Sequence, residues 1–361
     1  MTIYFIRKNL KKELKNRKMG INITYTGKGR NMKLGIIGAG KIAQEVLTFI
    51  NDIENIDLVA IAATPRSEEK LKNLSEKYGI DKYYTDYEDL IKNSEVELVY
   101  VALPNNLHYE VMDKALDHGK DIICEKPFTA NINQTLKIFK KAESKDRLVL
   151  EAMSNRFIPN AIKVKEEIPK LGKMKIVSFN YSQYSSRYDR FKNDDIAPAF
   201  SLENAGGALM DLNIYNIDYA INLFGRPKDV RYFPNIEKSI DTSGICLLDY
   251  EDFKVVCIGA KDSSASLINT IQGEEGTIEI PDALNNFGSY KIKETGGEYE
   301  SYNQNEDKSR LYYEFVAFEE IIRTRDIKRA EELKEITLIT AEVLNQARIE
   351  AGIFFPADNE N

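Results

Sequence analysis

The chain has 361 residues, 43% hydrophobic and 30% charged, a balance typical of a folded protein with one large or two smaller domains. Its formal charge of −7 argues against a nucleic-acid partner, and the sequence has no apolar run of the length that crosses a bilayer, so no membrane association is expected. Three scattered cysteines and two histidines disfavour a disulfide framework and a metal site, so we expect no metal and a reducing, cytoplasmic location.

Residues 1–31 differ from the rest of the chain, with nine lysines and arginines against the single acid Glu13. This extension could be a basic arm that contacts a polyanion, or a targeting peptide. A third alternative is that translation begins at Met32, and that the extension is not native or is disordered. We prefer the third alternative and keep these residues out of the functional interpretation.

Residues 32–50, MKLGIIGAGKIAQEVLTFI, predict a short strand, a glycine turn and a helix. The turn follows a GxGxxA pattern in which the first glycine permits a tight turn and the second lets the backbone approach a pyrophosphate. The helix N-terminus adds N–H donors and the positive end of a dipole. We therefore expect a dinucleotide to contact Gly38, Gly40, Lys41, Ile42 and Ala43.

Apolar runs then alternate with helical patterns as far as residue 150. This alternation predicts a Rossmann domain over residues 32–150, with a doubly wound parallel sheet. Ligands of such sheets bind beyond the carboxyl ends of the strands. Besides the glycine turn, the residues at such ends are Pro104, Asn105, His108, Glu125, Lys126 and Pro127.

The tip of the second strand bears on the choice of cofactor. NAD-binding proteins usually carry an acid there for the ribose diol, whereas an arginine suits the 2′-phosphate of NADP. This chain has no acid there but has Thr64, Arg66 and Ser67, in the segment AATPRSEEK. We therefore expect NADP to be preferred and NAD to be possible; the alternative is that Arg66 is only a solvated helix-turn residue.

Residues 151–361 predict an α+β domain. Segments 173–188, 245–260 and 265–280 alternate as half-buried strands do, and a long helical tail follows. Consecutive strands indicate a large open, mostly antiparallel sheet, and a face left uncovered suggests a homodimer or homotetramer formed through it.

The predicted helix over residues 206–225 carries polar side chains in one stripe. Asp211, Tyr215, Asp218 and Asn222 follow helical spacing on an otherwise apolar helix. The stripe is either the solvated face of the helix or one side of a cleft.

Five segments together resemble the Gfo/Idh/MocA oxidoreductases from residue 32 to about residue 357. They are GIIGAGKIA, VALPNNLHYE, CEKPFT, SNRFIP and GGALMDLNIYNID. Tyr215, where many members carry histidine, resembles the branch with glucose–fructose oxidoreductase and the dimeric dihydrodiol dehydrogenases. Two features depart from the family pattern: Asn213 replaces a usual glycine, and Asn204 and Ala205 precede only two glycines.

The resemblance implies an NAD(P)-dependent dehydrogenase or reductase that moves a hydride between nicotinamide and a CH–OH carbon of a sugar, polyol or dihydrodiol-like molecule. Lys126, Asp211 and Tyr215 would be the catalytic residues, with the Lys126 ammonium lowering the pKa of Tyr215. Asp211 and Tyr215 would also bind the substrate.

Further roles follow from the same resemblance. Glu125 would bind the nicotinamide ribose, and Asn105 and His108 would lie by the cofactor, although His108 could instead pack its loop. Arg156 either reaches the substrate or pairs with an acid within its domain. The alternative functions are a non-catalytic dinucleotide-binding sensor and a hydrolase that uses the dinucleotide transiently.

Overall fold

The computed structural model describes residues 31–359. The basic extension predicted for residues 1–31 therefore lies, except for Asn31, outside the described residues. All that follows concerns the compact unit that begins at Asn31.

The first part of this unit is a six-stranded sheet in the order β3-β2-β1-β4-β5-β6, with every pair parallel. The strands are β1 (Met32–Ile37), β2 (Ile56–Ala62), β3 (Lys82–Tyr84), β4 (Leu98–Val101), β5 (Asp121–Glu125) and β6 (Val149–Ala152). The helices are α2 (Lys41–Leu47), α3 (Glu68–Tyr78), α4 (Tyr87–Lys92), α5 (His108–Asp117) and α6 (Ile132–Lys145). The predicted doubly wound parallel sheet is confirmed, with its switch point between β1 and β4.

Two apolar clusters cover the two faces of this sheet. Leu34 and Ile36 of β1 belong to one cluster, whereas Ile37 belongs to the other. Because successive side chains of a strand point to opposite faces, both faces need apolar residues, which explains the continuous apolar runs.

The second part is an eight-stranded sheet in the order β14-β13-β12-β11-β7-β10-β9-β8. Only β7 and β10 pair in parallel, so the predicted mostly antiparallel sheet is confirmed. Its strands are β7 (Met174–Ser182), β8 (Asp229–Glu237), β9 (Ile240–Asp249), β10 (Lys254–Ala260), β11 (Asn269–Gly273), β12 (Gly276–Ile280), β13 (Tyr290–Glu294) and β14 (Glu300–Tyr302). The helices are α7 (Pro159–Glu167), α8 (Tyr188–Lys192), α9 (Ile214–Phe224), α10 (Arg310–Thr324) and α11 (Ile327–Glu350).

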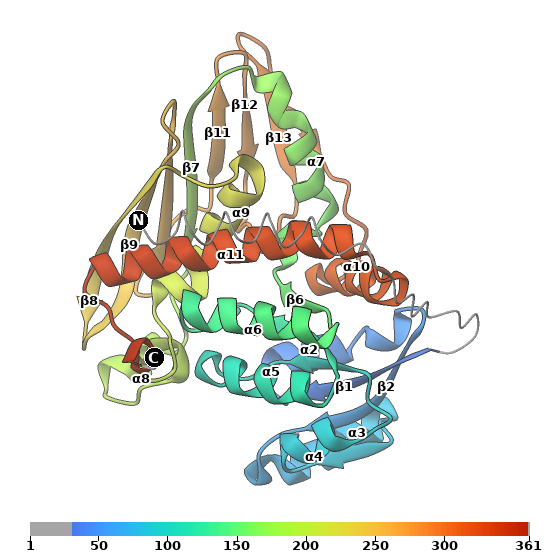
Figure 1. Ribbon diagram of the computed structural model, residues 1–361. Coiled ribbons are helices and arrows are strands. Elements are labelled where there is room, and N and C mark those ends of the chain that lie inside the picture. Colours follow the sequence, from blue (N-terminus) through green and yellow to red (C-terminus); the bar gives the residue numbers. More distant parts are fainter. Residues whose placement is uncertain (1–30, 360–361) are drawn as a thin grey trace. The chain divides into compact units, whose positions relative to one another are not determined.

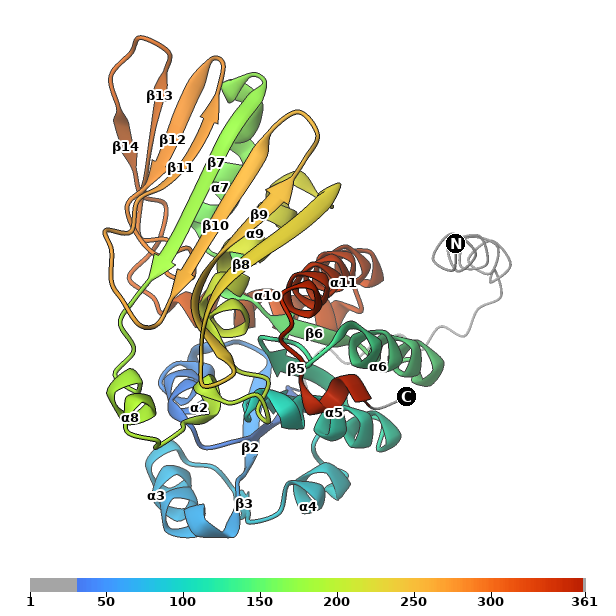
Figure 2. The same cartoon turned by 90° about the vertical axis from the view of Figure 1, so that its left-hand side faces the viewer.

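One face of this sheet is packed and the other is open. α9 and α11 contact the packed side, and Figure 2 shows the strands as one continuous layer. On the opposite face Phe233, Ile245 and Ile258 stand in register across β8, β9 and β10. Phe233 is 64% exposed and Ile245 44% exposed, so this row forms an apolar stripe without a cover in the described chain.

The C-terminal helices join the two parts. α11 contacts α6 and β6 on one side and α9 and β8 on the other (Figure 1). Phe315 and Phe318 of α10 pack in the same cluster as Leu34 of β1. The parallel sheet thus extends to Ala152, and α10 adds to the core of the Rossmann domain, although the sequence pattern assigned residues 151–361 to the second domain.

Candidate active site

Lys126 lies directly after β5, in a turn with a cis peptide bond to Pro127. Its Nζ donates to the backbone carbonyl of Asp211 at 2.7 Å and lies 3.3 Å from the Asp211 carboxylate. The same nitrogen is 4.6 Å from the centroid of the Tyr215 ring. The structure therefore brings together the three residues proposed for catalysis, from the edge of the Rossmann sheet and from a helix of the second domain.

A second lysine, absent from the sequence-based prediction, completes this group. Nζ of Lys261 lies 2.9 Å from Oδ2 of Asp211 and also donates to the carbonyl of Ala199. Burial alone would raise the pKa of the Asp211 carboxyl, but the ammonium groups of Lys261 and Lys126 outweigh burial and hold this pKa far below its usual value. The one available sequence signal was a lysine directly after the apolar strand β10.

The helix that carries Asp211 and Tyr215 begins with a π-helical turn, Leu209–Asn213, which continues into α9. Asp241 accepts a hydrogen bond from the N–H of Leu209 at 2.7 Å. Gly207 has φ +104° and would place a Cβ 2.1 Å from the Asp241 carboxylate, so only glycine fits there. The double glycine therefore lets Asp241 cap the start of the helix.

Both departures from the family pattern have partners in the structure. Asn213 donates to the carbonyl of Cys257 at 3.0 Å, and a Cβ on Gly259 would come within 2.6 Å of its side chain. The larger residue on the helix is thus matched by a glycine on β10. Ala205 adopts a left-handed conformation, φ +51°, and its carbonyl accepts from Asn105 at 2.8 Å.

The polar stripe divides between site and scaffold. Asp211 and Tyr215 belong to the site, whereas Asp218 is fully buried against Arg156. Asn222 accepts from Lys165 at 2.8 Å, near the surface. Neither sequence interpretation, a solvated face or a cleft wall, holds for the whole stripe.

Tyr215 is buried, and its carbonyl accepts from Asn155. Burial raises the pKa of its hydroxyl; Lys126 and Arg310 lower this pKa, but they do not reverse the direction. The expected lowering by Lys126 is therefore wrong as a net effect, because desolvation of the phenolate outweighs the nearby cation. A protonated phenol is suited to donate a proton.

The charges of Arg310 and Glu125 also act on Tyr215. Arg310, at the start of α10, donates to Ser154 at 3.3 Å and lies 3.6 Å from Glu45. Glu125 is buried and accepts a hydrogen bond from the Tyr100 hydroxyl. The Glu125 carboxylate thus has a partner within the domain, and its predicted contact with a ribose stays a prediction.

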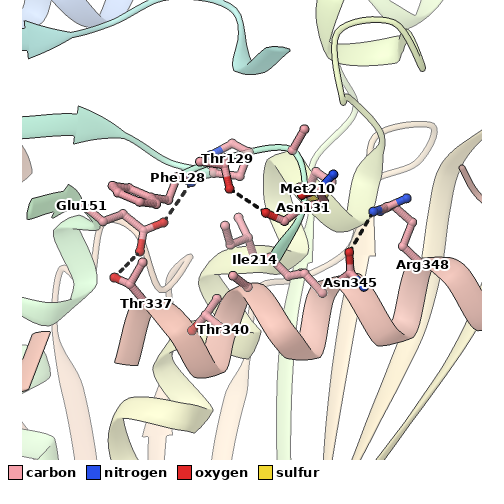
Figure 3. Close-up of a pocket in the computed structure, with 14 residues that line it drawn as sticks. Phe128, Thr129, Asn131, Glu151, Met210, Ile214, Thr337, Thr340, Asn345 and Arg348 are labelled. Atoms are coloured by element: carbon pink, nitrogen blue, oxygen red, sulfur yellow. Dashed lines mark hydrogen bonds between the residues drawn. The ribbon is translucent and has the colours of Figure 1, made fainter. Parts of the chain in front are cut away.

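Arg156 lies in a buried ionic network instead of an open pocket. Its guanidinium is 2% exposed and pairs with Asp218 and, at 2.8 Å, with Glu151. Of the two alternatives, the structure supports pairing with acids within the chain and leaves no exposed guanidinium surface for a substrate. The same Glu151 accepts from Thr337 and from the N–H of Phe128 (Figure 3).

The pocket drawn in Figure 3 lies beside this network and has a cavity of about 10 Å³. Thr337, Thr340 and Leu344 of α11 line one side, and Phe128 to Asn131 line another. A space of that size holds about one water molecule. The cavity therefore belongs to the scaffold behind the Lys126 turn and is too small for a substrate.

The glycine turn fits a dinucleotide. Gly38 has φ +124°, and a Cβ there would lie 2.1 Å from the carbonyl of Ala102, so the tight turn requires glycine. A Cβ on Gly40 would meet nothing within 4 Å, so open space lies in front of the backbone. Lys41 is exposed and Ile42 half-buried, while Ala43 is buried at the helix–strand contact.

The residues after β2 are open to solvent. Thr64 and Arg66 are exposed and Ser67 is half-buried, in a single 3₁₀ turn before α3. Within residues 31–359, Arg66 forms no ion pair. Its guanidinium is thus free to meet a phosphate.

The loop after β4 contains Pro104, Asn105 and His108. Pro104 is exposed, and Asn105 bonds to Ala205 as described. The buried His108 ring places one nitrogen 3.0 Å from the carbonyl of Pro127 and the other 2.9 Å from that of Leu103. Burial lowers the pKa of His108, so the ring is neutral and donates to only one of them. His108 thus links this loop to the Lys126 turn. Of the two roles considered for His108, this contact corresponds to packing of the loop.

No helix among residues 31–359 is long and apolar enough to cross a membrane. In the same range no three His, Cys, Asp or Glu side chains are grouped as metal ligands. The three cysteines are free and buried.

Comparison with known proteins identifies the family. A family model described as "Oxidoreductase family, NAD-binding Rossmann fold" matches residues 32–153, and the "GFO/IDH/MocA C-terminal domain" matches residues 169–279. The chain is 32% identical over 328 residues to scyllo-inositol 2-dehydrogenase (NADP(+)) IolU of Bacillus subtilis (strain 168), covering 91% of this chain and 99% of that protein. It is 27% identical over 349 residues to trans-1,2-dihydrobenzene-1,2-diol dehydrogenase of Mus musculus, with the same coverage of 91% and 99%.

Solved structures show the same fold. KijD10, a 3-ketoreductase from Actinomadura kijaniata crystallised with NADP, has a TM-score of 0.74 at 20% identity over 88% of this chain and 97% of that chain. The aldose-aldose oxidoreductase of Caulobacter crescentus has a TM-score of 0.73 at 20% identity, over 89% and 98%.

The family models span most of the chain, and the Bacillus relative matches it over nearly its whole length. These matches support the predicted enzyme over the non-catalytic sensor. The chain belongs to the Gfo/Idh/MocA family of NAD(P)-binding oxidoreductases.

Proposed function

We propose that the protein is an NADP-preferring dehydrogenase or reductase that acts on a secondary alcohol of a polyol or sugar, or on the corresponding ketone. The observation that carries this proposal is the grouping of Lys126, Asp211 and Tyr215. Lys126 follows β5 and the glycine turn follows β1, so both lie at the carboxyl edge of the same parallel sheet. The names of the relatives support the substrate class: they include an inositol dehydrogenase and a D-xylose dehydrogenase, both NADP-linked.

The preference for NADP rests on Arg66. An exposed arginine without an ion pair in the described chain follows β2, where an acid would favour NAD. A guanidinium offers a fork of donors that fits a phosphate. Thr64 and Ser67 stand beside it as further donors.

In the mechanism the residues of this chain handle the proton and the charge on oxygen. The dinucleotide, when bound, supplies or accepts the hydride at nicotinamide C4. Lys126 donates to the substrate oxygen and stabilises negative charge that develops there. Tyr215 gives its proton to that oxygen during reduction and takes a proton from the alcohol during oxidation. Asp211 holds the Lys126 ammonium through its carbonyl and its carboxylate.

The direction of the pH dependence follows from the raised pKa of Tyr215. A protonated phenol is ready for reduction at neutral pH. Oxidation requires the proton to leave first, so its rate should rise as the pH increases into the alkaline range.

The proposed function is tested by supplying substrates. The protein is incubated with inositols, other polyols, aldoses and dihydrodiols, each with NADP⁺ and with NAD⁺, while the absorbance of reduced nicotinamide is followed. We expect turnover on at least one polyol or sugar and a higher kcat/KM with NADP⁺. Tight dinucleotide binding without turnover on any substrate, in either direction, would contradict the proposal.

We propose in addition that two copies of the chain associate through the open sheet face. The apolar row runs along three adjacent strands: Phe233 and Ile245 are exposed, and Ile258 is half-buried. Contiguous apolar surface of this kind is costly in water and is typical of an interface. The occupant would be the same face of a second copy, because a twofold contact is the commonest arrangement of identical chains.

A further inference from the structure

Lys261 lies behind the catalytic group, on the side away from solvent. Its side chain is 2% exposed, whereas that of Asp211 is 33% exposed and that of Lys126 is 13% exposed. Accessibility therefore decreases from the Asp211–Lys126 pair to Lys261. Lys261 therefore has almost no surface of its own to offer a substrate, and its ion pair with Asp211 connects it to the more exposed part of the site.

The position of Lys261 is fixed by several contacts. Its backbone N–H donates to the carbonyl of Thr242, and its carbonyl accepts from Ser185. Its ammonium lies 4.1 Å from the centroid of the Phe200 ring and donates to the carbonyl of Ala199. A lysine is costly to bury unless it is paired, and Asp211 is its one ion-pair partner among residues 31–359.

Charge balance gives this contact a consequence for the reaction. Lys126 and Asp211 alone would be a neutral pair, and the carboxylate would cancel much of the field that Lys126 exerts on the substrate oxygen. With Lys261 the group of three carries one net positive charge. That charge stabilises an alkoxide or phenolate in a poorly solvated site more than it would in water.

We propose that Lys261 is a positioning residue that offsets the charge of Asp211, so that Asp211 holds Lys126 without neutralising it. This inference rests on the proposed function, because it assigns Lys261 a part in the same site. Lys261 touches neither substrate nor cofactor in this account; it acts through the Asp211 carboxylate.

The groups that titrate around the site come from several elements. Tyr215 faces Lys126, Arg310, Glu125, Asp211 and Tyr181. Lys261 faces Asp211 and also Asp241, whose pKa burial raises to about 6. The pKa of Asp211 is held far below its usual value and that of Asp241 is about 6, so both aspartates are ionised in the alkaline range where the shift caused by Lys261 is measured.

The test compares Lys261→Met, Asp211→Asn and the double variant with the wild type. Methionine is unbranched, nearly as long as lysine and suited to a buried site, while asparagine keeps the shape of aspartate. The pH dependence of kcat for alcohol oxidation is measured for each protein. Dinucleotide affinity, followed by the fluorescence of bound NADPH, serves as the control for folding of the cofactor site.

Each variant has its own expected result. The rising limb is the pH range in which kcat for alcohol oxidation increases. In Lys261→Met this limb should lie about one pH unit higher, and kcat at neutral pH should be about tenfold lower, because a cation is lost. The double variant removes both charges, and its limb should return towards that of the wild type even if its rate is low. NADPH affinity should stay within about twofold throughout.

A limb that stays at the wild-type pH in Lys261→Met would overturn the proposal, since a merely structural role lowers rates without moving the profile. If Lys261→Met does not fold, the limbs of Asp211→Asn and of the double variant are compared instead. Asp211→Asn keeps both lysine charges, whereas the double variant keeps only that of Lys126. The rising limb of the double variant should therefore lie at a higher pH than that of Asp211→Asn. Equal limbs would overturn the proposal.

A second readout does not need turnover. Carboxyl-carbon NMR of the aspartates, with Asp211→Asn for assignment, follows the ionisation of Asp211 in acid. We expect Asp211 to stay ionised in the wild type and to titrate at higher pH in Lys261→Met. An unchanged Asp211 titration contradicts the Lys261 inference, whereas a wild type without turnover contradicts the proposed function.

Discussion

Single side chains decide how charge is distributed around the Lys126 ammonium. Two of its donated hydrogen bonds go to one residue, Asp211, and the Tyr215 ring lies beside it. The acids nearby are held by cations or by hydroxyl groups, as Lys261 holds Asp211 and Tyr100 holds Glu125. The site therefore offers a positive charge to an incoming oxygen although the whole chain has an excess of acids.

Arg66 is the residue on which the cofactor preference depends. Arg66→Ala should weaken NADP binding about 10- to 100-fold, because a charge-assisted hydrogen-bonding group is lost, and should leave NAD binding nearly unchanged. The measurement is the dissociation constant of each dinucleotide by fluorescence titration.

Arg231→Ala is the matched control for Arg66→Ala. This exposed arginine lies on β8, in the eight-stranded sheet, and pairs with Glu350 at the end of α11 and with Asp229. We expect both dinucleotide affinities to stay at the wild-type level in the control. An equal loss of NADP and NAD affinity in Arg66→Ala would show that the arginine does not recognise the 2′-phosphate.

Glu314 gives a pH-dependent prediction for stability. It is fully buried in α10, and neither carboxylate oxygen has a partner among the described residues. Burial, and then the charge of Glu125, raises the pKa of Glu314 well above its ordinary value. The folded state therefore favours the protonated form, and wild-type stability should decrease as the pH rises above the unfolded value near 4.5.

Glu314→Gln removes this dependence. The variant should be more stable than the wild type at pH 8 by roughly 1–3 kcal/mol, because glutamine cannot ionise and each unit of pKa shift is worth about 1.4 kcal/mol; the gap should shrink towards pH 5. Urea unfolding at the two pH values measures the gap. A gap that is constant with pH would mean that Glu314 is not a buried acid that titrates in this range.

Among the secondary-structure elements, a buried ionic network joins β6 and α9 to the turn that carries Lys126. Arg156 links Asp218 of α9 to Glu151 of β6, and Glu151 accepts from the N–H of Phe128 in the turn after Lys126. Asn155, beside Arg156, donates to the carbonyl of Tyr215. The network thus fixes the distance between the turn that carries Lys126 and the helix that carries Tyr215.

Arg156→Met tests this role. Removing one partner leaves two buried carboxylates without their cation, so the variant should lose about 3–5 kcal/mol of unfolding free energy. Urea unfolding measures the loss. The control is Arg190→Met, which removes an exposed pair with Asp195 and should cost less than about 1 kcal/mol. Equal small losses in both variants would mean that the buried network does not hold the site together.

The sequence allowed the elements to be predicted better than their contacts. The parallel sheet, the glycine turn and the grouping of Lys126, Asp211 and Tyr215 followed from local patterns and the family resemblance. Lys261 and Arg310 did not, because each is a single charged residue whose partner lies far away in the sequence. The net pKa direction of Tyr215 and the burial of Arg156 also depend on how deeply the folded chain covers them, which residue spacing does not reveal.

At the scale of the whole molecule, the open face of the eight-stranded sheet exposes apolar side chains that no described residue covers. Phe233→Asp places a charge on the most exposed residue of the apolar row on β8, β9 and β10. If two copies associate through this face, the wild type should have the mass of a dimer and Phe233→Asp that of a monomer, because a charge buried without a partner is strongly unfavourable. Light scattering after size-exclusion chromatography measures both masses.

Leu136→Asp is the control for the dimer prediction. Leu136 is 50% exposed on α6, in the Rossmann domain and outside the eight-stranded sheet. This variant should keep the mass of the wild type. A wild type that is already monomeric, or a Phe233→Asp variant that stays dimeric, would contradict association through the open face.

Turnover should depend on Lys126, which is held by Asp211 beside Tyr215. The most direct measurement is the formation of reduced nicotinamide from NADP⁺ and a polyol by the wild type and by Lys126→Met, with NADPH binding determined for both. We expect the variant to bind NADPH nearly as well as the wild type and to lose at least about 10²-fold in kcat. Undiminished turnover by Lys126→Met would show that Lys126 takes no part in the reaction.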